Sequence, residues 1–67
     1  MLLGNKIRKF RKERGMTQEK LANLLHVTSS AISSYETEKR TPDIYMLCNI
    51  ADLFDVNLDN LLGRTKE

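Results

Sequence analysis

The sequence predicts an all-α domain built from five short helices. Apolar residues recur every three or four positions along most of the chain, which is the period of an amphipathic helix. The alternation of apolar and polar residues that marks a β-strand is missing from it. We expect helices at 3–14, 18–25, 29–36, 42–54 and 58–62, within one domain that spans residues 1–67.

The first two helices are delimited by residues that stop and start helices. Leu3, Ile7 and Phe10 fall on one stripe of the first helix. Gly15 follows it and can take the positive φ that ends a helix. Thr17 then suits the N-cap of the second helix. The inner face of that helix would hold Leu21, Ala22, Leu24 and Leu25.

The connection at His26 and Val27 is so short that it predicts a tight turn between the second and third helices. Such a turn often needs a residue in the left-handed region, where histidine is enriched among residues that carry a Cβ. Metal binding by His26 is the competing interpretation, but the sequence has no second histidine to support it. We expect Thr28 to cap the third helix with its hydroxyl.

The third helix has two unlike faces. At about 100° per residue, Ala31, Ile32 and Tyr35 fall close together and form an apolar face. The opposite face consists of small hydroxyl side chains, namely Ser29, Ser30, Ser33, Ser34 and Thr37. Because the outer face of a surface helix usually carries charged residues, this bare face predicts a surface for contact.

The fourth helix is expected to begin with Thr41 as its N-cap and Pro42 at its first position. Met46 and Leu53 lie nearly opposite its main apolar face, where they would either contact a partner or extend the core round the helix. Asn57 suits the N-cap of the last helix. The main apolar face of the fourth helix would include Ile44, Leu47, Cys48, Ile50, Ala51 and Phe54.

The net charge of +2 conceals an asymmetry. Residues 1–20 carry seven Lys or Arg and two Glu, a balance of +5. Residues 41–67 carry two Lys or Arg and five acids, a balance of −3. The amino-terminal part of the chain is therefore the part that can approach a polyanion.

Composition also limits the class of protein. The single cysteine, Cys48, cannot form an internal disulfide, and its neighbours are typical of a helix core. The sequence has no signal-peptide core and no apolar run near the roughly 20 residues that span a bilayer. These features predict a cytoplasmic protein. One histidine and one cysteine supply neither a catalytic set nor a metal cluster, so we expect no enzyme, cofactor, metal or small-molecule ligand.

Several motifs together resemble those of a known family. They are Gln18-x-x-Leu21-Ala22, Ala31-Ile32-Ser33-Ser34-Tyr35-Glu36, Lys39-Arg40-Thr41-Pro42-Asp43, Ile50-Ala51-Asp52-x-Phe54-x-Val56 and Leu61-Leu62-Gly63. Over nearly its whole length the chain is similar to the phage-repressor and Cro-like helix-turn-helix proteins, the Xre family. The resemblance implies a compact five-helix, lambda-repressor-like domain that binds operator DNA as a dimer. Its second and third helices would form the helix-turn-helix, with His26 where the family usually has glycine.

In such proteins the third helix lies in the major groove and presents its amino-terminal residues to the base edges. The expected base-reading residues are Thr28, Ser29, Ser30, Ser33 and Ser34. The expected phosphate-binding residues are Thr17, Gln18, Thr37, Lys39 and Arg40. Because serine is short and both donates and accepts hydrogen bonds, we expect DNA shape to supply much of the specificity.

The resemblance further implies a partly buried ion pair between Arg11 and Glu36, which would tie the first helix to the third. A two-fold dimer would use the last helix, through Leu58 and Leu61, with Asn60 and the end of the fourth helix nearby. We expect a repressor that binds a palindromic operator with half-sites about 34 Å apart. The alternative is an antitoxin-like module that neutralises a partner protein and binds DNA secondarily. The sequence has no further tail for binding a toxin, which favours the regulator.

Overall fold

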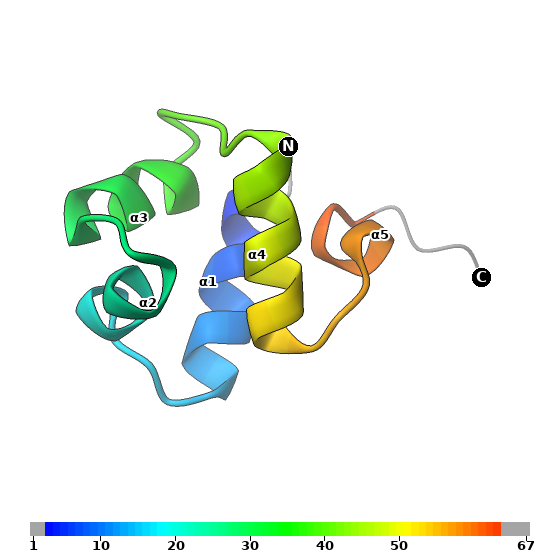
Figure 1. Ribbon diagram of the computed structural model, residues 1–67, viewed down its shortest axis with the longest axis horizontal. Coiled ribbons are helices and arrows are strands. Elements are labelled where there is room, and N and C mark those ends of the chain that lie inside the picture. The colour runs from blue at the N-terminus through cyan, green and yellow to red at the C-terminus, as the bar shows by residue number, and fades with distance from the viewer. Residues whose placement is uncertain (1–2, 64–67) are drawn as a thin grey trace.

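The computed structural model of the protein describes residues 3–63. Within this range it has five α-helices, which are α1 (Leu3–Glu13), α2 (Gln18–Leu25), α3 (Ser29–Glu36), α4 (Ile44–Phe54) and α5 (Leu58–Leu61). Figure 1 shows α4 in the middle, with α2 and α3 on one side of it, α5 on the other and α1 behind. The prediction of an all-α fold with five helices is confirmed. The predicted domain also includes residues 1–2 and 64–67, which lie outside the described range.

One hydrophobic core joins the helices. Every helix contributes at least one of the largest fully buried side chains, which are Ile7, Leu21, Ile32, Ile50, Phe54 and Leu61. Each such side chain contributes about 1.5–3 kcal/mol through its burial. Helices as short as α2, α3 and α5 are not stable alone in water, so they depend on this shared core for their structure.

The helix boundaries follow mostly from local hydrogen bonds. Thr17, Thr28 and Asn57 each accept a hydrogen bond from the backbone amide three residues later, at 3.0, 3.1 and 2.6 Å. These three predicted N-caps are therefore confirmed. Gly15 follows α1 with a φ of 67°, as expected for a glycine that ends a helix. The helices α1 and α5 each end one residue earlier than predicted.

The predicted start of α4 is wrong by two residues. Asp43, and not Thr41, is the N-cap, because its Oδ1 accepts a hydrogen bond from the amide of Met46 at 2.8 Å. Pro42 stands before the cap and is buried. A carboxylate at this position also interacts favourably with the positive end of the helix dipole, which threonine cannot do.

The predicted apolar face of α4 is also partly wrong. The buried side chains of α4 are Ile50, Ala51 and Phe54. Ile44 is 54% exposed and Cys48 is exposed too, so neither belongs to the core. Met46 and Leu53 are instead half-buried and pack against the core. The core therefore extends round α4 toward these two residues, and the side of α4 that carries Cys48 faces outward.

Candidate nucleic-acid interface

The turn between α2 and α3 is closed by backbone hydrogen bonds. His26 adopts the left-handed conformation, with φ 61° and ψ 41°, as the sequence predicts. Its amide donates to the carbonyl of Asn23 at 3.3 Å, and the amide of Val27 donates to the carbonyl of Ala22 at 3.0 Å. Val27 is half-buried against the core. The chain can thus reverse sharply while keeping α3 packed on α2.

The two faces predicted for α3 are present in the structure. The residues of α3 that are buried are Ala31, Ile32, Tyr35 and Glu36. The predicted base-reading residues at its amino end are exposed, namely Thr28, Ser29 and Ser30. Ser33 and Ser34, one turn further along, are half-buried. The amino end of α3 is therefore the part that offers free hydroxyl groups to another molecule.

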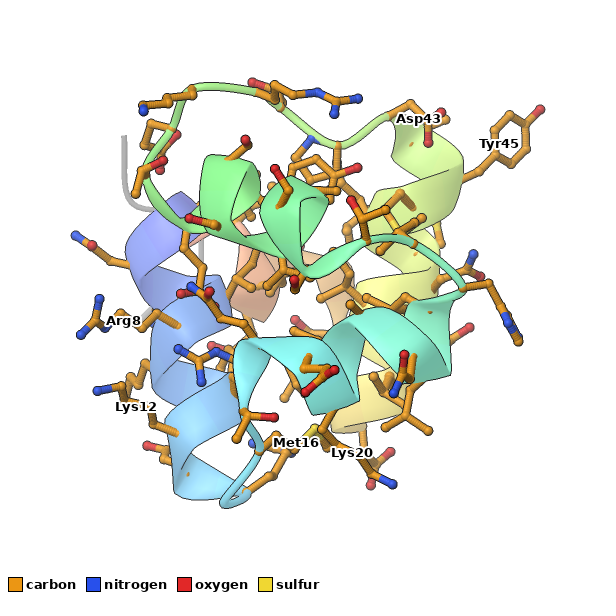
Figure 2. The ribbon with its side chains drawn as sticks, turned by 90° about the vertical axis from the view of Figure 1, so that its left-hand side faces the viewer. Arg8, Lys12, Met16, Lys20, Asp43 and Tyr45 are labelled. Atoms are coloured by element: carbon orange, nitrogen blue, oxygen red, sulfur yellow. The ribbon has the colours of Figure 1, made fainter. Side chains whose placement is uncertain are left out.

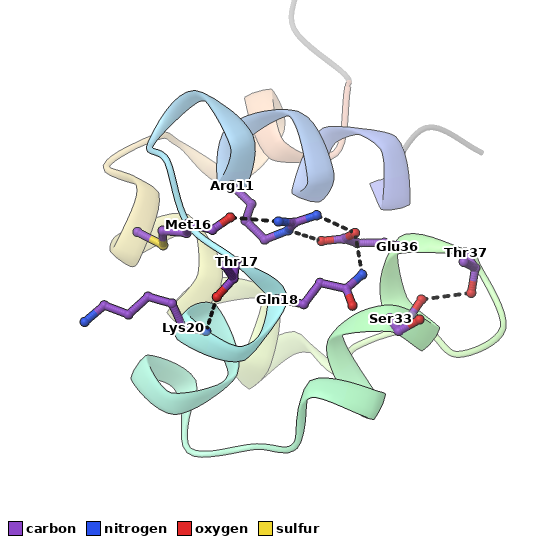
Figure 3. Close-up of polar contacts among 8 residues, drawn as sticks. All are labelled: Arg11, Met16, Thr17, Gln18, Lys20, Ser33, Glu36 and Thr37. Carbon is purple, nitrogen blue, oxygen red and sulfur yellow. Dashed lines mark hydrogen bonds and ion pairs between the residues drawn. The ribbon is translucent and has the colours of Figure 1, made fainter.

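A buried polar network holds the helix-turn-helix against α1. The carboxylate of Glu36 accepts hydrogen bonds from Arg11 Nε at 2.6 Å, from Arg11 Nη2 at 3.2 Å and from Gln18 Nε2 at 3.1 Å. The third guanidinium nitrogen, Arg11 Nη1, donates to the carbonyl of Met16 at 2.7 Å (Figure 3). Both charged residues are 7% exposed, so the predicted ion pair is confirmed and is buried. The network connects α1, the start of α2 and the end of α3.

The start of α2 retains donors for an anion. Thr17 uses its hydroxyl oxygen to accept from the amide of Lys20, so its hydroxyl proton stays available. Gln18 uses one amide proton on Glu36 and keeps a second one. The first amides of a helix also have no acceptor within that helix. Together these groups make a site suited to a phosphate oxygen.

The remaining predicted phosphate-binding residues, Thr37, Lys39 and Arg40, follow the carboxyl end of α3. Lys39 and Arg40 are exposed, and their amides both donate to the carbonyl of Ser34, at 2.9 and 3.2 Å. The hydroxyl of Thr37 donates to the carbonyl of Ser33 at 2.9 Å. That proton is therefore in use, and a phosphate could receive it only by displacing the carbonyl. The structure thus favours Lys39 and Arg40 over Thr37 as phosphate donors.

Further basic side chains border the face formed by α2 and α3. Figure 2 looks onto this face and shows Arg8 and Lys12 extending from α1 at one edge, with Lys20 below. All three are exposed. Asp43 and Tyr45 lie at the opposite edge, at the start of α4. The positive charge predicted for the amino-terminal part is therefore on the surface, beside the helix-turn-helix.

The structure assigns contacts to two residues that the sequence did not single out. Arg14 Nη1 donates to the carbonyl of Phe10 at 3.1 Å, Nη2 donates to the carbonyl of Phe54, and the guanidinium lies 5.4 and 5.1 Å from the centres of the two rings. Glu38 Oε2 accepts from the amide of Gly4 at 2.6 Å. The partners are up to 40 residues apart, so no spacing in the sequence marks them.

The residues predicted to form a dimer contact differ in accessibility. Leu58 and Asn60 are half-buried. Leu61 is 0% exposed and packs into the core of its own chain, so the prediction that it touches a second chain is wrong. Ile44 and Tyr45 at the start of α4 are 54% and 79% exposed, which makes them the more accessible apolar side chains.

Residues 3–63 form a shallow pocket, but they contain no group of metal ligands and no membrane-spanning helix. A shallow depression between α2 and α4 is lined by Leu24, Leu25, His26, Asn49, Asp52 and Leu53. No group of three His, Cys, Asp or Glu side chains in the described part of the chain could hold a metal ion. None of the helices described is long and apolar enough to cross a membrane.

Comparison with known proteins defines the class. The helix-turn-helix family model matches residues 7–61, and the chain belongs to this family. The curated relatives that it matches are HTH-type transcriptional regulators and not enzymes. The chain is 38% identical to the uncharacterized HTH-type transcriptional regulator YqaE of Bacillus subtilis over 67 residues, which is 98% of this chain and 58% of that protein. It spans about half the length of three curated relatives that it matches, YqaE, ImmR and AnsR, with 58%, 50% and 54% of their lengths.

Two solved structures share the fold. The P22 c2 repressor in complex with a synthetic operator superposes with a TM-score of 0.88 at 28% identity, covering 97% of this chain and 98% of that one. The N-terminal DNA-binding domain of SinR from Bacillus subtilis gives 0.84 at 33% identity, covering 98% and 97%. The predicted likeness to phage repressors and the lambda-repressor-like fold are therefore confirmed.

Proposed function

We propose that this protein is a sequence-specific DNA-binding transcriptional repressor that acts as a two-fold dimer on a palindromic operator in the cytoplasm. The observation that carries the proposal is the exposed hydroxyl end of α3, held in place by the buried network of Arg11 and Glu36. The likeness to the P22 c2 repressor, whose structure contains a synthetic operator, supports DNA as the partner.

In this proposal the amino end of α3 enters the major groove. Ser29 and Ser30 are exposed and lie nearest the bases, where each hydroxyl can donate or accept a hydrogen bond. Ser33 and Ser34 are half-buried and would contact the bases through water or at the edge of the groove. Hydroxyl groups discriminate bases weakly, so DNA shape would add specificity.

Two groups of phosphate contacts would hold α3 in the groove. The start of α2 supplies Thr17, Gln18 and its free amides on one side. The loop after α3 supplies Lys39 and Arg40 on the other. Each cation that neutralises a phosphate should steepen the dependence of log K on log salt by about 0.9.

The proposed dimer uses the outer surface of α5 with the start of α4. Leu58 and Asn60 remain partly accessible there, whereas Leu61 is not. Ile44 and Tyr45 add exposed apolar surface, which a monomer rarely retains without a function. Leu58→Glu should then disrupt the dimer and so weaken operator binding. Analytical ultracentrifugation measures the change in oligomeric state.

Selection of binding sites from random duplex DNA at a stated salt concentration tests the function. We expect a palindrome with half-sites about 34 Å apart. The double variant Ser29→Glu, Ser30→Glu should lose binding to the selected site while keeping its helical circular dichroism. The control Asn5→Glu adds a negative charge at an exposed position of α1 that is proposed for neither the DNA contact nor the dimer contact, and it should still bind. Unchanged affinity of the serine double variant would contradict the proposal.

A further inference from the structure

We propose that Glu38 is a positioning residue for DNA binding, which fixes the loop after α3 so that Lys39 and Arg40 meet the phosphates. This inference rests on the proposed function. Glu38 itself cannot be a phosphate ligand, because its carboxylate repels phosphate oxygens. An acid beside two proposed phosphate contacts therefore needs another explanation, and its contact with α1 supplies one.

The contact is a hydrogen bond across the molecule. Glu38 Oε2 accepts from the amide of Gly4 at 2.6 Å, although the two residues are 34 positions apart. Gly4 is the second residue of α1, and an amide there has no acceptor within its own helix. A carboxylate is also favoured at this end of a helix by the helix dipole. Glu38 thus caps α1 from a distant loop.

The backbone of α1 lies directly against the end of α3 at this point. A Cβ added to Gly4 would lie 2.7 Å from the carbonyl oxygen of Tyr35 and 2.7 Å from Glu38 Oε2, and it would also collide with the carbonyl oxygen of Glu36. Only glycine permits this approach. The loop after α3 is therefore anchored on a closely packed helix end.

The loop backbone is fixed at the same place. Glu38 has a φ of 66°, a left-handed conformation that is unfavourable for a residue with a Cβ. Immediately after it, the amides of Lys39 and Arg40 both donate to the carbonyl of Ser34. The side-chain contact with Gly4 and these backbone bonds together hold the backbone from which the two cationic side chains extend in one position relative to α3.

The test compares Glu38→Gly with the conservative variant Glu38→Gln. Glycine accepts the left-handed conformation without strain but removes the contact, whereas glutamine removes the charge and keeps an acceptor for the Gly4 amide. Affinity for duplex DNA of mixed sequence is measured over a range of salt concentrations. Amide hydrogen exchange at Gly4, followed by NMR without DNA, shows whether the contact is present in each variant.

The slope of log K against log salt concentration is negative, and its magnitude grows with the number of phosphate contacts. We expect Glu38→Gly to reduce this magnitude by about 1–2, equivalent to one or two lost phosphate contacts. We expect Glu38→Gln to keep the slope of the unmodified protein. Arg40→Gln alone should reduce the magnitude of the slope by about 0.9. In a protein that already carries Glu38→Gly, the same substitution should reduce it by less. An unchanged slope for Glu38→Gly, with faster exchange at Gly4, would show that Glu38 only caps α1 and would overturn the inference.

Failure of the proposed function gives a different result. In that case the unmodified protein itself would show no salt-dependent affinity for DNA, and the inference would fall with it. The exchange measurement needs no DNA, so protection of the Gly4 amide would still report the contact. Slow hydrogen exchange of the Gly4 amide in the Glu38→Gly variant would show that Glu38 is not the acceptor that protects this amide.

Discussion

The two ends of α3 differ in how they are held. At the carboxyl end, Glu36 accepts two buried hydrogen bonds from Arg11 and a partly buried one from Gln18, and Glu38 accepts a hydrogen bond from the start of α1. At the amino end the side chain of Thr28 caps the helix, and the hydroxyls of the next two serines make no hydrogen bond within residues 3–63. The hydroxyl groups proposed to read DNA are therefore available, while the opposite end of α3 is anchored to α1.

This difference separates stability from recognition along one helix of 8 residues. Substitutions that break the contacts of the carboxyl end, or the N-cap at Thr28, should mainly affect the free energy of unfolding. Substitutions of the exposed serines at the amino end should mainly affect DNA affinity. Five substitutions test the comparison, from the largest expected loss of stability to the smallest.

Glu36→Ala should cost about 3–5 kcal/mol of unfolding free energy, because it leaves the charge of Arg11 buried without its partner. Urea unfolding followed by circular dichroism measures the loss. Glu19→Ala, at an exposed position of α2, is the control and should change stability by less than about 0.5 kcal/mol. A loss at Glu36 no larger than that of the control would mean that the carboxyl end is not the anchor.

Gly4→Ala should cost about 1–3 kcal/mol, because the added methyl group collides with the carbonyl oxygens at the end of α3. In an exposed helix the same change is normally stabilising by about 1 kcal/mol, so the sign decides the question. Asn5→Ala, the exposed neighbour, serves as the control in the same thermal unfolding assay. Stabilisation by Gly4→Ala would show that α1 does not pack closely on α3.

Thr28→Ala should cost about 1 kcal/mol, the usual value of an N-cap, because the amide of Ala31 loses its acceptor. Thr41→Ala is a matched control, since Thr41 is exposed and caps no helix in this structure. Urea unfolding of both variants would tell them apart. Equal effects at the two threonines would argue against the N-cap at Thr28.

Ser29→Ala and Ser30→Ala should each change stability by less than about 0.5 kcal/mol, because both side chains are exposed. Each should nevertheless weaken binding to the selected operator by about 1 kcal/mol, the typical value of one neutral hydrogen bond. Fluorescence anisotropy with labelled operator DNA measures the affinity. A loss of stability without a loss of affinity would contradict the proposed role of these serines in recognition.

Local interactions were the predictable part of the fold and the site. The caps at Thr17 and Thr28 involve amides three residues away, and the left-handed turn at His26 depends on its own backbone. The polar face of α3 follows from the helical period. The ion pair of Arg11 with Glu36 was implied by family resemblance and not by spacing.

Predictions that depended on neighbouring helices were less successful. Helical periodicity alone could not show that Ile44 and Cys48 face outward, because which side of α4 is covered depends on where α2 and α5 pack. Leu61 carried the same uncertainty, since an apolar residue on a short helix can face its own core or a second chain. The structure places it in the core.

Five helices, most of their caps, the tight turn and the hydroxyl face of α3 can be predicted from the amino-acid sequence, because these features depend on residues within about one helical turn. How α3 is anchored becomes apparent only from the packing of the helices. The bonds from Arg11 to Glu36, from Gly4 to Glu38 and from Arg14 to Phe54 join residues 25, 34 and 40 positions apart. Contacts at such separations exist only once the helices have packed. The exposed amino end of α3 can therefore be predicted from the sequence, whereas the anchoring of its carboxyl end depends on the tertiary fold.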